Sequence, residues 1–162
     1  MRDPRQRLAA RPMRAMTLMA TASALIIASS PAHTQSQAQR WIWTLYDDSN
    51  PVVLALEIPD TPRLKTTLEC ESHSSLVRIS MYENEALPEG PAIIRAGNHQ
   101  SPAQIESRGT RRIATLQVDH PVFNAFQADG RLEISASDQT ATISVGSANL
   151  SKLNRFARAC AT

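Results

Sequence analysis

The two cysteines, Cys70 and Cys160, are the feature that most limits how this chain can fold. Two cysteines permit only one intramolecular disulfide, and this one would join two positions that lie far apart in the chain. Redox enzymes usually place their cysteines close together, as in C-x-x-C, and this pair does not fit that pattern. In an oxidising compartment the pair therefore indicates a structural disulfide rather than a reactive thiol or a metal site.

Alternation of apolar and polar residues predicts strands on both sides of the chain's midpoint. In residues 64–71 the even positions, which include Cys70, are expected to face inward, and the odd positions, which include Thr67, outward. Residues 76–82 alternate in the same way and follow a short turn at His73-Ser74-Ser75, which indicates a hairpin. Residues 131–135 and 140–145 predict a second hairpin, with its turn near Asp138-Gln139.

Helical spacing predicts two helices. The first begins at Asp119-His120-Pro121, where His120 is expected to act as a cap, and it ends at Gly130. The second follows Ser147, its expected cap, and carries an apolar stripe at Leu150, Leu153, Phe156, Ala157 and Cys160. A disulfide to Cys160 would then tie this final helix to the strand that contains Cys70.

Shorter apolar runs complete the predicted fold. Strands are expected at residues 41–46, 52–58, 92–96, 103–107 and 112–118, with loops at 83–91 and 97–102. The predicted fold is mainly β, a β-sandwich or a barrel-like antiparallel sheet, with one short helix and a C-terminal helix. The second description of the same pattern is an α+β fold.

The first 32 residues have the order of a secretory signal peptide: arginines, then an apolar run at 13–28, then small residues. The run is shorter than the roughly 20 apolar residues that a spanning helix needs. Cleavage is expected before His33 or before Gln39, and either Met1 or Met13 can be the initiator. We therefore expect a signal peptide (1–32), a flexible mature N-terminus (33–40) and one β-rich domain (41–162), in the bacterial periplasm or secreted, with no membrane span after cleavage.

The net charge of +2 belongs to the leader rather than to the body. Five of the 17 basic residues and one of the 15 acidic residues lie in the first 14 positions, so the remainder is slightly acidic. That balance argues against a nucleic-acid partner. Arg108, Arg111 and Arg112 form the one basic cluster of the body, with no flanking aromatic residue. They are candidate contacts for an acidic partner.

No catalytic, cofactor or metal motif is present in the sequence. The serines lack the G-x-S-x-G pattern of a nucleophile elbow. Cys70 and His73 have the spacing of two metal ligands, but a zinc site needs three or four. His99 and His120 are the histidines that a dispersed hydrolytic site would use. The residues thus predict no cofactor, no metal and no assigned catalytic residue.

The strand at residues 41–46 contains both tryptophans. Trp41 and Trp43 are two positions apart and therefore share one face of the strand. Such a pair is most often part of the core, yet a first strand is often at a sheet edge. If their face is exposed, Trp41 and Trp43 are the best candidate anchors for a partner, because tryptophan is enriched at interface hot spots.

The segment from Phe123 to Ala161 carries the resemblance to known families. Its short helix, Gly130-Arg131-Leu132 turn, hairpin and final helix ending in Cys160 are similar to the closing segment of small alphaproteobacterial periplasmic proteins of the VasI type, associated with type VI secretion, and of the IalB type, associated with invasion. The cysteine pair and Ser135-Ala136-Ser137 also resemble MliC-type lysozyme inhibitors. These resemblances imply an exported, non-enzymatic protein that binds a protein or envelope component. The alternatives are an inhibitor of a wall-degrading enzyme and a hydrolase with a dispersed site.

Overall fold

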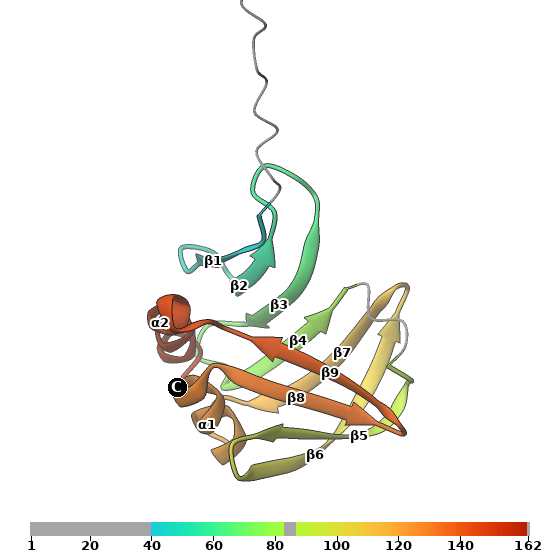
Figure 1. Ribbon diagram of the computed structural model, residues 1–162. Helices are drawn as coiled ribbons and strands as arrows, with labels where there is room; N and C mark the ends of the chain where they lie inside the picture. The colour runs from blue at the N-terminus through green and yellow to red at the C-terminus, as the bar shows by residue number, and fades with distance from the viewer. Residues whose placement is uncertain (1–39, 83–86, 162) are drawn as a thin grey trace, which may run out of the picture. The chain divides into compact units, whose positions relative to one another are not determined.

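The computed structural model describes residues 40–82 and 87–161, and all of the strands in this part of the chain belong to one curled, half-barrel sheet (Figure 1). The order of its strands is β1-β2-β3-β4-β7-β6-β5-β8-β9, and every neighbouring pair is antiparallel. The mainly β prediction is therefore confirmed. The strands are β1 (Ile42–Tyr46), β2 (Val52–Glu57), β3 (Leu64–Cys70), β4 (Leu76–Met81), β5 (Gly90–Ala96), β6 (His99–Arg108), β7 (Arg111–Gln117), β8 (Arg131–Ala136) and β9 (Gln139–Ser144).

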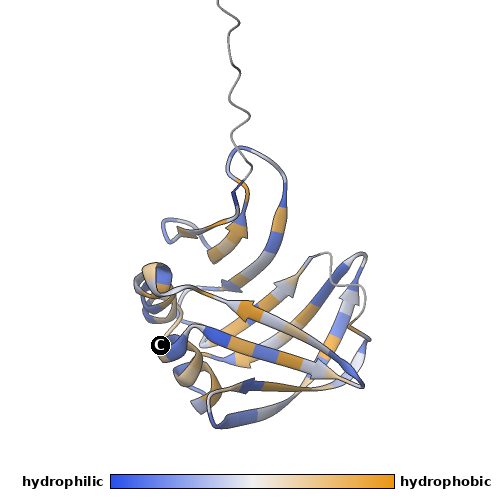
Figure 2. Cartoon of the chain, in the orientation of Figure 1, coloured by the Kyte–Doolittle hydropathy of each residue, from blue (hydrophilic) through white to orange (hydrophobic). Residues whose placement is uncertain are grey.

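Alternation along the strands gives the sheet one apolar face, and the core lies against it (Figure 2). The two helices, α1 (Pro121–Asp129) and α2 (Leu150–Cys160), add buried aromatic side chains to this core. Phe123 and Phe126 of α1 pack edge to face, with ring centroids 5.8 Å apart. Phe156 of α2 is fully buried. Burial of this apolar surface is the main stabilising term of the fold.

Helix α1 begins and ends as predicted. The backbone N–H of Val122 donates to Nδ1 of His120 at 3.1 Å, so the histidine side chain satisfies one of the free N–H groups of the first turn. Gly130 ends the helix with φ of 69°, a conformation that favours glycine. A Cβ at this position would lie 2.1 Å from the carbonyl oxygen of Val145, so no other residue fits there without a backbone shift.

The predicted disulfide between Cys70 and Cys160 is present, and it joins the end of β3 to the last residue of α2. Their Cα atoms are 5.8 Å apart, and the bond closes a loop across 90 residues of sequence. Backbone hydrogen bonds support the junction, because the N–H of Ser75 donates to the carbonyl of Cys160 at 3.0 Å. The final helix is therefore fixed to the β3–β4 turn by covalent and polar contacts together.

The loop predicted at residues 97–102 is wrong. These residues form the turn and the first part of a long hairpin, in which β5 and β6 are joined by Gly97 and Asn98 alone. Proline usually interrupts a strand, yet Pro102 lies within β6. In an antiparallel pair, alternate residues direct their N–H groups away from the partner, and Pro102 stands at such a position, so no hydrogen bond to β5 is lost.

Two further predictions about single side chains need correction. Thr67 shares the outward face of β3 with Glu69, as predicted, but it is buried there, and its hydroxyl donates to Oε1 of Glu69 at 2.6 Å. Ser147 does not cap the final helix: it begins a 3₁₀ turn (Ser147–Asn149), and α2 starts at Leu150 without a side-chain cap. The predicted signal peptide (1–32), most of the predicted flexible segment (33–40) and part of the predicted loop at 83–91 lie outside the described residues.

Candidate binding surface

The face of β1, β2, β3, β4 and β7 that points away from the core, here called the outer face, carries the candidate site. Strand register places its side chains in rows that cross the sheet. One row consists of Tyr46, Val53, Glu69, Arg78 and Thr115. The row beside it consists of Thr44, Ala55, Thr67, Ser80 and Ile113. The second row is made mostly of small residues, so the longer side chains of its neighbours dominate the surface.

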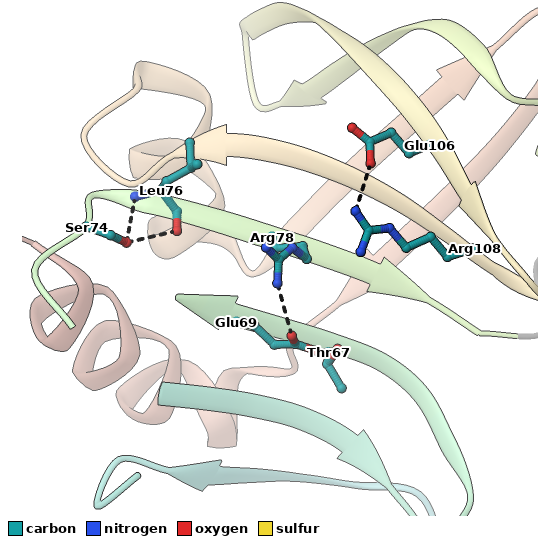
Figure 3. Close-up of polar contacts among 7 residues, drawn as sticks. All are labelled: Thr67, Glu69, Ser74, Leu76, Arg78, Glu106 and Arg108. Carbon is teal, nitrogen blue, oxygen red and sulfur yellow. Dashed lines mark hydrogen bonds and ion pairs between the residues drawn. The ribbon is translucent and has the colours of Figure 1, made fainter. Parts of the chain in front are cut away.

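A hollow of about 130 Å³ lies on the outer face next to the disulfide, and we call it the disulfide hollow. Glu69 of β3 and Arg78 of β4 point toward one another across it, with 3.9 Å between Oε2 and Nη1 (Figure 3). Leu76 lies at its rim with half of its surface exposed (50%). The Ser74 hydroxyl bonds both the N–H and the carbonyl of Leu76, which fixes the start of β4. The hollow thus combines a held ion pair with an exposed apolar side chain. The complete lining is Pro51, Glu69, Cys70, Glu71, Ser74, Leu76, Arg78 and Thr115.

A second, wider hollow of about 560 Å³ lies on β1 and the segment after β2, and we call it the β1–β2 hollow. Ile42 and Tyr46 are both exposed there. The phenolic O–H of Tyr46 donates to Oε1 of Glu57 at 2.6 Å, and this bond, with partial burial and the nearby Glu57 and Asp60 charges, raises the pKa of Tyr46. Its complete lining is Ile42, Thr44, Tyr46, Glu57, Pro59, Asp60, Thr61 and Pro62.

Ser80 is the buried polar side chain that lacks a hydrogen-bond partner among the described residues. It lies in the row of small residues, between Thr67 of β3 and Ile113 of β7. A buried hydroxyl without a partner costs about 1–3 kcal/mol.

Trp43 belongs to the core, the placement that the sequence favoured for the tryptophan pair, so the alternative of a partner anchor is wrong for Trp43. Trp43 is only 4% exposed, and its Nε1 donates to the carbonyl of Ser144 at 3.0 Å. Trp41 is half-buried, and the guanidinium of Arg63 lies 5.3 Å from its ring. The exposed side chains of β1 are Ile42 and Tyr46, on the opposite face. The same period of two that grouped the tryptophans could have identified them.

The three arginines predicted as a patch are held by separate contacts. Arg112 donates from Nε to the carbonyl of Leu87 and from Nη1 to the Ser107 hydroxyl, both at 2.7 Å. Arg108 is ion-paired with Glu106 at 3.8 Å (Figure 3). Arg111 lies 5.8 Å from the ring of Tyr82, so an aromatic residue distant in sequence does flank the cluster. Register places Arg108 directly opposite Arg111, and Arg112 has a structural role.

His120 and His73 have structural roles. His120 caps α1, and Nδ1 of His73 lies 3.0 Å from the carbonyl of Ala161, next to the disulfide. Within residues 40–82 and 87–161, no group of three or more His, Cys, Asp or Glu side chains could hold a metal ion. In the same ranges, no helix has the length and apolar character needed to cross a membrane.

Comparison of the chain with protein-family models, with curated proteins and with solved structures finds no match.

Proposed function

We propose that this chain is an exported, non-enzymatic binding protein whose outer face docks a protein partner of the cell envelope. One observation carries the proposal. Of the four large hydrophobic side chains exposed in the described residues, three lie at the two hollows of this face: Ile42, Tyr46 and Leu76. Exposed apolar and aromatic side chains with a charged rim are typical of interfaces that bind a protein.

The charges around the hollows favour a basic partner. Among the described residues, four carboxylates line them, from Glu57, Asp60, Glu69 and Glu71, whereas Arg78 is the one cationic side chain in either lining. Complementary potentials speed encounter and select the register of a complex. A partner with apolar side chains surrounded by lysine or arginine therefore fits this face best.

Export is supported by the disulfide and by the leader. Disulfides persist in oxidising compartments and are rare in the cytosol, and Cys70 and Cys160 form one. The arginine-rich start, apolar run and small residues of the first 32 positions have the order of a signal peptide. The periplasm or the medium is thus the expected location of the mature chain.

The test compares capture of envelope proteins by the mature chain and by three variants. Ile42→Glu and Leu76→Glu each place a charge on the outer face. Ile93→Glu is the matched control, because Ile93 is as exposed as Ile42 but lies on β5. Quantitative mass spectrometry should find a protein that the wild-type and Ile93→Glu chains retain and that both outer-face variants lose. Equal capture by all four chains would overturn the proposal.

A further inference from the structure

Strand β9 leaves one edge of the sheet unpaired. It is the last strand in the order, and β8 is its single neighbour in the described sheet. The N–H of Val145 donates to Gly130 at 2.7 Å on the β8 side, whereas the carbonyl of Ser144 accepts the Trp43 indole on the other side. Because main-chain groups alternate in direction along an antiparallel strand, those of Thr140 and Thr142 also point away from β8.

The other free edges are protected by a charge or a proline, and β9 has neither, although the indole of Trp43 occupies the Ser144 carbonyl at its end. On β1, the carbonyl of Trp43 accepts a hydrogen bond from Nζ of Lys152. On β6, Pro102 has no N–H to offer along the stretch that β7 does not pair. Charges and prolines are the usual protection of edge strands. The sequence of β9, QTATIS, contains neither, so its edge is open to a further strand.

A hollow of about 350 Å³ adjoins this edge, and we call it the β9 hollow. Met81, Ala141 and Ile143 give it an apolar floor, because all three are buried. Among the described residues, Lys65 is the one charged member of its lining. The lining also includes residues of β3 and β4, so an added strand would lie beside them as well as beside β9. The complete lining is Lys65, Thr66, Met81, Tyr82, Ala141, Thr142 and Ile143.

We propose that the edge of β9 binds an extended peptide segment of a partner protein by strand addition. Main-chain groups of the segment pair with those of Thr140 and Thr142, an apolar side chain enters the β9 hollow, and an acidic neighbour meets Lys65. An extended segment is the occupant that this site matches, because the site offers unpaired main-chain groups, an apolar hollow and the cation of Lys65, which complements an acidic side chain. Its lining shares no residue with the two hollows of the outer face, and the proposal goes beyond the proposed function.

The test uses a defined peptide. The probe is the acetylated and amidated hexapeptide Glu-Val-Glu-Val-Glu-Val, titrated into the ¹⁵N-labelled mature chain. The backbone amides of Thr140 and Thr142 should shift in a saturable way and become protected from hydrogen exchange. The same peptide with every amide N-methylated should leave them unchanged, because it cannot donate main-chain hydrogen bonds. Lys65→Glu should weaken binding by about tenfold, because it replaces an attractive charge with a repulsive one.

Two proline variants distinguish peptide binding at the β9 edge from binding elsewhere on the molecule. Thr142→Pro removes an N–H that β8 does not use, so the chain should fold but lose peptide binding. Gln104→Pro removes a free N–H on β6 in the same way and should retain binding. Unchanged binding by Thr142→Pro, or shifts confined to the outer face, would refute the proposal. So would a wild-type dimer in light scattering that Thr142→Pro converts to a monomer. If Thr142→Pro does not fold, the methylated peptide decides the question on the wild-type chain.

Discussion

Residue by residue, strand β1 shows how one alternation serves two purposes. Its odd positions, Trp43 and Leu45, pack against the core, and its even positions, Ile42 and Tyr46, face solvent. The large ring of Trp43 fills space in the core, and its indole N–H also bridges β1 to β9. Trp43 therefore stabilises the core, whereas the exposed side chains of Ile42 and Tyr46 are available to a partner.

Replacement of Trp43 tests this division. Trp43→Ala should lower the free energy of unfolding by about 3–5 kcal/mol, because it leaves a cavity and removes the bond to Ser144. Urea denaturation measures the loss. Trp41→Ala should cost clearly less, since Trp41 is half-buried. In a Trp41→Phe chain the remaining emission should be blue-shifted and resistant to iodide; red-shifted, quenchable emission would place Trp43 at the surface.

Tyr46 should titrate above the ordinary tyrosine pKa of about 10, because its O–H donates to the Glu57 carboxylate. The folded state therefore holds this proton more tightly than the unfolded chain. Its contribution to stability is full below the ordinary pKa and is lost as the pH rises through the raised value. Phenolate absorbance in a Tyr82→Phe background isolates Tyr46. Glu57→Gln should shift its titration toward lower pH, and an unchanged curve would contradict the assigned cause.

At the scale of elements, α2 depends on long-range contacts more than on its own ends. It lacks a side-chain cap, and its apolar stripe and Cys160 face the sheet. In addition to the disulfide, Lys152 and Arg155 of α2 bond Trp43 and Asp47 of the β1 region. The helix thus covers one end of the sheet and holds β1 in place.

Removal of the disulfide should be costly. For a loop across 90 residues, the chain-entropy model assigns about 4.6 kcal/mol of stabilisation, and measured values are often lower. The double variant Cys70→Ala, Cys160→Ala should therefore unfold at a markedly lower urea concentration than the oxidised chain. Its α2 amides should exchange with solvent faster than those of α1. Equal midpoints for the two chains would show that the other contacts of α2 suffice.

For the whole molecule, export can be tested independently of any partner. The apolar run and the small residues after it predict cleavage before His33 or before Gln39. Intact-mass spectrometry of the protein from the periplasmic fraction or medium should find one of these two starts, at a mass that also shows an oxidised cysteine pair. A chain that starts at Met1 or Met13 and remains with the membrane would contradict the prediction.

The sequence by itself determined the features that depend on local periodicity and on cysteine number. These are the mainly β class, the inward-facing positions of most strands, both helices with the Gly130 end of α1, and the Cys70–Cys160 bond. Each follows from side chains that repeat every two or three to four residues, or from a pairing with one solution. The same periodicity also predicts that Ile42 and Tyr46 share the opposite face of β1.

Only the tertiary structure decided which surfaces stay open, because strand order is set by contacts between residues far apart in sequence. Nothing local shows that Pro102 has its missing N–H on an unpaired side, or that Glu69 meets Arg78 beside Leu76. Tyr82 meets Arg111 for the same reason. The curled sheet brings β1 to β9 through one hydrogen bond of the Trp43 indole and leaves the rest of the β9 edge unpaired. The exposed edge of β9 and the two hollows of the outer face follow from this arrangement of strands.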